Sequence, residues 1–149
     1  MKTFTDAAGR TWTMALNLGT ALAVKSKLGI DLLQPEAGNP PLITRLGTDE
    51  LLLGEVLCAL LENQFVAHKV TEADVRMSFD GKTLLSAQKA FYEELEDFFR
   101  NRGRVDRAQV VAAQGRFIQK ATAAVEQKLA AIDIDAIIDG ALSGNLQES

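Results

Sequence analysis

The sequence predicts a mainly α (α+β) domain, in which an N-terminal β-hairpin packs on a compact bundle of about five to six helices. Residues 1–16 alternate polar and apolar positions and are rich in Thr and aromatics, as paired strands are. From residue 17 the apolar residues recur with helical spacing, and the last such segment is long. The 149 residues suit a single domain over 1–149, made of the hairpin (1–16), a helical part (17–142) and a polar tail (143–149).

The hairpin turns at DAAGR, residues 6–10, where a glycine favours a tight reversal. Beyond the turn, Trp12, Met14 and Leu16 share one face, because alternate side chains of a strand point the same way. A two-stranded hairpin is marginally stable alone in water. We therefore expect the Trp12 face to lie on the helices that follow.

The first helix is marked at both ends. Asn17 is a good N-cap for a helix through about Leu28, and Gly29 suits the left-handed conformation that ends a helix. The segment QPEAGNPPL, residues 34–42, holds all three prolines and is the one obvious loop.

The second helix is expected to be the central element. Thr48 is its predicted N-cap, and it runs to about Val66. Glu55 and Glu62 mark its only consistent polar strip, and a helix that is apolar nearly all round is a buried one. The apolar positions are Leu51, Leu52, Leu53, Val56, Leu57, Leu60 and Leu61.

Two further helices follow. Thr71 and Asp74 resemble a capping box that starts a short helix toward Phe79. After a turn at Asp80, a strongly amphipathic helix runs until Gly103. Its apolar side carries Leu84, Leu85, Phe91, Tyr92, Leu95, Phe98 and Phe99.

Asp106 is the expected cap of a long C-terminal helix. The apolar residues of that helix have the spacing by which a helix binds in a groove. Gln114 and Lys128 fall inside the stripe, which a fully sealed core disfavours. Packing of the stripe on the rest of the domain is the alternative to partner binding or self-association. The candidate partner-contact residues are Val110, Phe117, Ile118, Val125 and Leu129.

A last short helix is expected before the polar tail. Asp133 and Asp135 are alternative caps for it, and it ends at about Leu142.

Composition narrows the function classes. The net charge of −4 makes nucleic acid an unlikely partner, because non-specific binding to polyanions needs clustered positive charge. The N-terminus is a poor match to a secretory signal, and the apolar run 51–61 is shorter than the ~20 residues that cross a bilayer. We expect a cytoplasmic protein that spans no membrane.

The sequence carries no enzyme signature. One Cys and one His exclude a disulfide framework and leave almost nothing for a zinc site. Cys58 lies in the central helix and is expected to act as a small hydrophobe, and His68 to be a surface or capping residue. We assign no catalytic, cofactor-binding or metal residue, and we expect a non-enzyme without cofactors.

Two charged clusters have structural interpretations. The carboxylates at 93–97 diverge around a helix, which favours a solvated face over a catalytic pair. The basic run at 100–107 favours pairing with a helix C-terminus over phosphate binding. That run contains Arg100, Arg102, Arg104 and Arg107.

Four segments in order carry a family resemblance. They are FTDAAGRTW at 4–12, LGIDLL at 28–33, LLLGEVLCAL at 51–60 and EELEDFFR at 93–100. In order and spacing they resemble the small tail assembly chaperones of tailed bacteriophages and prophages, over about the first hundred residues.

The resemblance implies a mostly helical, non-catalytic protein that binds the tape measure protein during tail assembly in the bacterial host cytoplasm. It transfers no functional residue to a numbered position here. Two other functions stay open: a structural tail or head–tail connector protein of the virion, and a DNA-associated helical regulator.

Overall fold

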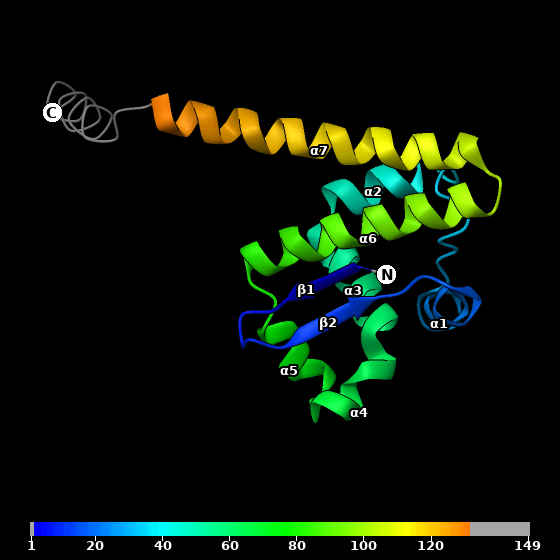
Figure 1. Ribbon diagram of the computed structural model, residues 1–149, viewed down its shortest axis with the longest axis vertical. Coiled ribbons are helices and arrows are strands. Elements are labelled where there is room, and N and C mark those ends of the chain that lie inside the picture. The colour runs from blue at the N-terminus through cyan, green and yellow to red at the C-terminus, as the bar shows by residue number, and fades with distance from the viewer. Residues whose placement is uncertain (1, 132–149) are drawn as a thin grey trace, which may run out of the picture. The chain divides into compact units, whose positions relative to one another are not determined.

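The computed structural model describes residues 2–131 and confirms a mainly helical fold with an N-terminal antiparallel hairpin and a long C-terminal helix (Figure 1). By its internal contacts the chain divides after Gly115 into two units, Met1–Gly115 and Arg116–Ser149. The expected last short helix and the polar tail 143–149 lie outside the described residues. The elements are β1 (Lys2–Thr5), β2 (Thr11–Met14), α1 (Leu18–Leu28), α2 (Leu42–Thr48), α3 (Glu50–Leu61), the 3-10 turn η1 (Glu62–Gln64), α4 (Phe65–His68), α5 (Glu72–Met77), α6 (Gly81–Asn101) and α7 (Val105–Ala131).

The hairpin is held between helices of the first unit, with α6 on one side and α4 and α5 on the other (Figure 1). In its register Phe4 pairs with Trp12, and Lys2 pairs with Met14. Trp12 is completely buried, in edge-to-face contact with Phe65, and Met14 and Phe4 are buried as well. The expected docking of the Trp12 face on the helices is confirmed.

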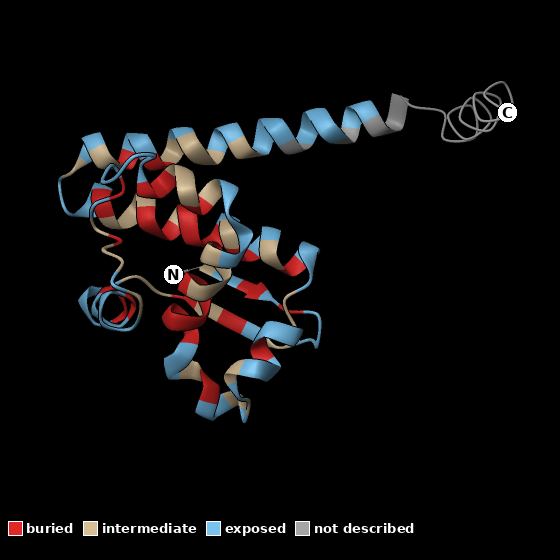
Figure 2. Ribbon diagram, turned by 180° about the vertical axis from the view of Figure 1, so that it is seen from behind, coloured by how far each residue is buried: buried red, intermediate tan, exposed pale blue. Residues whose placement is uncertain are grey.

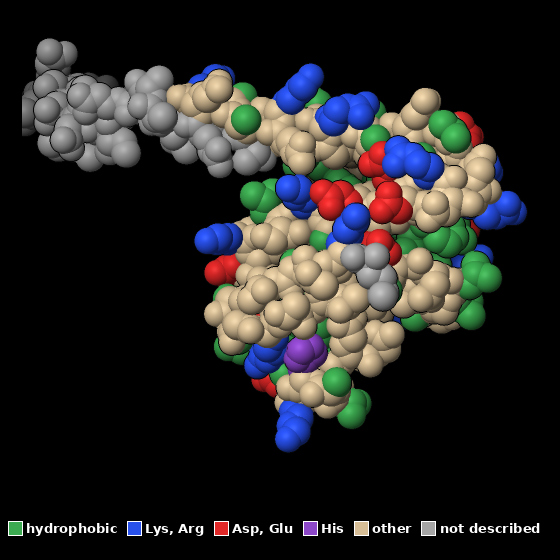
Figure 3. All heavy atoms as spheres, in the orientation of Figure 1, with side chains coloured by type: hydrophobic (Ala, Val, Ile, Leu, Met, Phe, Trp, Pro, Cys, Tyr) green, Lys and Arg blue, Asp and Glu red, His purple; other side chains and the backbone are tan. Residues whose placement is uncertain are grey.

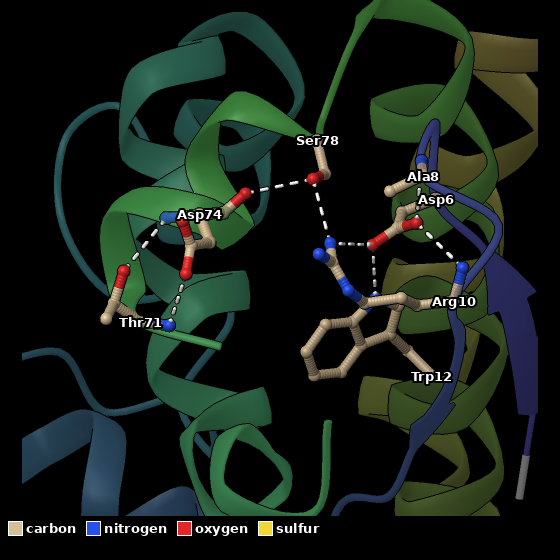
Figure 4. A network of polar contacts seen from close by, with 7 residues as sticks. All are labelled: Asp6, Ala8, Arg10, Trp12, Thr71, Asp74 and Ser78. Atoms are coloured by element: carbon tan, nitrogen blue, oxygen red, sulfur yellow. Dashed lines mark hydrogen bonds and ion pairs between the residues drawn. The ribbon is translucent and has the colours of Figure 1, made fainter. Parts of the chain in front are cut away.

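The turn of the hairpin closes on a buried carboxylate, that of Asp6 (Figure 4). Asp6 Oδ1 accepts hydrogen bonds from the backbone N–H groups of Ala8 (3.0 Å) and Arg10 (2.9 Å). Asp6 Oδ2 accepts one from Trp12 Nε1 at 2.9 Å, and Arg10 Nη1 lies 3.4 Å from the same oxygen. Burial raises the pKa of Asp6, but these hydrogen bonds together hold it below its ordinary value.

The same turn is joined to the end of α5. Arg10 Nη1 donates to Ser78 Oγ at 3.0 Å, and the backbone N–H of Ala7 donates to the Ser78 carbonyl at 3.0 Å. Gly9 has a φ of +84°, a left-handed conformation that favours glycine. The turn sequence therefore sets both the shape of the hairpin and its place against the helices.

The central helix α3 begins later and ends earlier than the sequence suggests. Asp49, and not Thr48, is its N-cap, with the carboxylate accepting from the Leu52 N–H at 3.1 Å. Thr48 belongs instead to the preceding α2, a helix the sequence analysis does not predict. Regular α-helix stops at Leu61, and the turn η1 follows.

Burial along α3 matches the expectation from Leu53 to Leu61, where every residue except Gly54 and Glu55 is buried. In the first turn, Leu51 is 84% exposed and Leu52 is half-buried. Both glutamates of the predicted polar strip form ion pairs: Glu55 with Arg76 at 2.9 Å and Glu62 with Lys27 at 3.4 Å. The buried residues are Leu53, Val56, Leu57, Cys58, Ala59, Leu60 and Leu61.

By length and composition alone, the helical segment Glu50–His68 is long and apolar enough to span a membrane, with 19 residues and a mean hydropathy of 1.2. Most of its apolar side chains are those that α3 contributes to the core, whereas Leu51 and Val66 are 84% and 88% exposed. The core position accounts for the apolar character of the segment.

Several helix ends are as the sequence predicts. Asn17 forms a capping box at the start of α1, and Gly29 ends that helix with a φ of +71°. Thr71 and Asp74 form a second capping box at α5. Asp106 was expected to cap α7 but is its second residue.

The apolar face of α6 is largely as expected. Phe91, Leu95 and Phe99 are buried, whereas Leu85 is 45% exposed. Glu94 is also buried, which departs from the solvated acidic face that was expected.

We expect Asp6→Asn to destabilise the fold by about 2 kcal/mol near pH 7, because one oxygen that accepts hydrogen bonds in the buried turn becomes a donor. The folded-state pKa of Asp6 lies below its unfolded value, so its stabilisation is present above about pH 4 and lost as the pH falls through the folded pKa. Urea unfolding at several pH values measures this. A wild-type–mutant difference that stayed constant down to about pH 2 would contradict it.

We expect Leu57→Ala to cost about 2–5 kcal/mol, since Leu57 is fully buried in α3. The matched control is Leu51→Ala, six residues earlier in the same helix, where the side chain is 84% exposed and the change should stay within about 0.5 kcal/mol. Denaturant midpoints of the two variants give the comparison. Equal losses would mean that α3 is not the core element.

Candidate functional site

The five candidate contact residues on α7 differ in how far their side chains are exposed. Phe117 and Val125 are 66% and 55% exposed, and Val110 is 41% exposed. Ile118 is half-buried. The side chain of Leu129 lies outside the described residues. Three of the five residues are thus exposed, and much of α7 has the colour of exposed residues in Figure 2.

The start of α7, up to Gly115, has a different face that packs inside the first unit. Ala108 and Val111 are buried, and a Cβ at Gly115 would lie 3.8 Å from the ring of Tyr92. These positions follow one another at intervals of three and four residues, as one helix face does. Burial therefore differs along the apolar residues of α7: Val111 is buried, whereas Phe117 is exposed.

Three of the four arginines of the basic run, Arg100, Arg104 and Arg107, contact carboxylates or backbone. Arg100 pairs with Glu96 on α6, as its spacing predicts. Arg104 contacts Asp106 at 2.9 Å, and its side-chain hydrogen bond lowers the pKa of that carboxyl to about 2.

Arg107 ties the start of α7 to the proline-rich loop. It donates to the Leu33 carbonyl at 2.7 Å and to Glu36 at 2.8 Å, and its guanidinium lies 5.9 Å from the Phe99 ring centre. Three arginines of the basic run thus contact carboxylates or a loop carbonyl, whereas pairing with a helix C-terminus was expected.

The acidic cluster of α6 does not converge on one point. Glu96 faces Arg100, whereas Asp97 lies 3.5 Å from Lys2. Glu94 accepts a hydrogen bond from the Leu16 N–H at 3.3 Å. Among residues 2–131, no group of three or more His, Cys, Asp or Glu side chains is placed to hold a metal ion.

A hollow of about 420 Å³ lies beside this cluster, lined by Leu16, Glu94, Asp97, Phe98, Asn101 and Arg102. A second one, of about 350 Å³, lies between α1 and the end of α3. Its polar lining includes Asn17, which caps α1, and Glu62, which is paired with Lys27. Neither hollow brings together a nucleophile and a base.

Cys58 and His68 are both packed against other side chains of the fold. Cys58 is 4% exposed, and burial raises the pKa of its thiol to about 11, which suits the small hydrophobe that was expected. His68 is half-buried, with its ring centre 4.4 Å from that of Trp12. It therefore packs on the hairpin and is not a plain surface residue.

Comparisons of the chain with protein-family models, curated proteins and solved structures find no match. The motif FTDAAGRTW itself has a structural explanation, since its aromatic residues are buried and Asp6 and Gly9 shape the turn. Large apolar side chains are exposed on α7, and among the described residues they are also exposed on α1 (Leu18, Leu22), α3 (Leu51), α4 (Val66) and α5 (Met77).

We expect Cys58 to be inert toward a thiol reagent at about pH 8 in the folded protein, because it is buried and protonated there. In denaturant the same thiol should react fully. Release of the chromophore from an aromatic disulfide reagent follows both states. Rapid, complete labelling of the native protein would show that the thiol is accessible.

Proposed function

We propose that this chain is a non-catalytic, protein-binding tail assembly chaperone of a tailed phage or prophage, acting in the host cytoplasm. Its partner is the tape measure protein. The observation that carries the proposal is the exposed apolar row on α7, where Phe117 and Val125 are 66% and 55% accessible. Large side chains exposed at helical spacing are characteristic of a helix that meets a partner.

The composition of α7 supports this use. Ala121, Ala123 and Ala124 are all exposed, and alanine has the highest helix propensity. Such a segment stays helical with little support from packing. A chaperone needs an apolar surface that is available before its partner arrives, and α7 offers one without disturbing the core.

Two alternatives remain distinct from this proposal. A structural tail or head–tail connector protein would stay in the finished particle, so its presence in purified virions would favour that function. A DNA-associated regulator would need unpaired cations in its basic run. Of its four arginines, Arg100, Arg104 and Arg107 each contact a carboxylate, and only Arg102 takes part in none of the ion pairs of the described residues, which favours a protein partner.

The test is co-purification of the tape measure protein with tagged wild type and with Phe117→Asp. We expect the substitution to reduce the retained tape measure at least about tenfold, because it places a charge in the apolar contact. Leu51→Asp is the matched control, since Leu51 is 84% exposed and lies in the first turn of α3, where a carboxylate is tolerated.

Circular dichroism first establishes that both variants fold. If the folded Phe117→Asp protein retains tape measure as wild type does, α7 is not the contact surface. If wild type retains none, the chaperone function is wrong as well.

A further inference from the structure

We propose that the distal face of α7 selects an amphipathic helix whose apolar stripe is bordered by carboxylates. The apolar part of this distal face is the row Phe117, Ala121 and Val125, and its charged border is Arg116, Lys120 and Lys128. The inference rests on the proposed function and adds the chemistry by which the partner segment is recognised.

The apolar row has the geometry of a helix contact. Its members are spaced four residues apart and span about 12 Å of helix, roughly two turns. Phe117 and Val125 project at the ends, with the small Ala121 between them, and all three are exposed. A row of this kind leaves a notch over the alanine into which a ridge of a second helix packs.

The charges beside the row are of one sign. Arg116, Lys120 and Lys128 are exposed, and residues 116–131 contain only one carboxylate, in a chain whose net charge is −4. Figure 3 shows Lys and Arg side chains along α7. By helical spacing, Arg116 and Lys120 lie along one border of the row, and Lys128 lies at its far end.

These cations differ from the arginines at the start of the helix. Arg104 and Arg107 pair with carboxylates of their own unit. The distal cations take part in none of the ion pairs found within residues 2–131. Among the side chains that the structure describes, no carboxylate pairs with these three cations.

The charge pattern also selects between occupants. The α7 helix of a second copy would bring the same three cations to the contact, and like charges in apposition oppose association. A helix with Glu or Asp beside its apolar residues places an opposite charge against each cation. The acidic amphipathic helix is the occupant that the distal face fits.

The test uses two fluorescent synthetic helices and the full chain. Both peptides carry the same leucine stripe at positions i, i+3, i+4 and i+7, bordered by Glu in one and by Lys in the other. Fluorescence anisotropy gives the two dissociation constants at low and high salt. We expect the Glu-bordered helix to bind at least about tenfold more tightly, with a preference that shrinks as salt rises.

Lys120→Glu is the diagnostic variant, and Lys82→Glu is its control. Lys82 is an exposed lysine in the first turn of α6, so both variants change the net charge equally. We expect Lys120→Glu to reduce the preference for the Glu-bordered helix at least about threefold more than Lys82→Glu does.

Three results would overturn the inference: equal binding of the two peptides, equal effects of the two variants, or a dimer in sedimentation that Phe117→Ser dissociates. The last would place a second copy on the distal face. Retention of the tape measure without a preference for the Glu-bordered peptide leaves the proposed function standing and removes this inference. A preference for the Glu-bordered peptide without retention of the tape measure removes the proposed function and leaves the charge preference of the distal face standing.

Discussion

The buried carboxylate of Asp6 is the interaction on which the arrangement of the first unit depends. A charge inside a protein is tolerated only when its oxygens are supplied with donors, and Asp6 receives them from the backbone of its own turn and from Trp12. The turn cannot open without leaving that charge unpartnered in the core. Arg10 extends the same network to Ser78, so the hairpin and α5 are positioned together.

Around this network, α3 contributes seven buried residues to the core. Ion pairs at the surface connect the helices that surround α3. Lys27 of α1 contacts both Glu62 and Glu72, and Arg76 contacts both Glu55 and Glu72. The four contacts join α1, α3, η1 and α5 through half-exposed side chains. Exposed pairs of this kind stabilise weakly, so they orient the helices while burial supplies most of the stability.

The sequence predicts the fold where one local signal decides the outcome. The alternation around Trp12, the Asn17 cap and the Thr71–Asp74 capping box act within a few residues, and the structure confirms them. The prediction failed where two signals compete. Thr48 and Asp49 are both good caps, and only the presence of α2 decides between them.

For the candidate site, too, local sequence signals predict only part of the arrangement. Helical spacing alone identifies an apolar stripe on α7, but it cannot tell which edge of that stripe packs on the domain. Val111 is buried together with Ala108, whereas Phe117 is 66% exposed. The burial of Glu94 likewise depends on the backbone of Leu16, 78 residues away in the chain, which no local pattern contains.

Gln64 has a consequence for how this protein meets other chains. Its side-chain amide donates to the Thr13 carbonyl at 2.8 Å and accepts from the Thr13 N–H at 3.0 Å, so it stands in for a third strand along β2. A free strand edge is a template on which a foreign extended segment adds by backbone pairing. With the middle of β2 occupied in this way, a foreign strand cannot pair with Thr13 unless it displaces the Gln64 side chain.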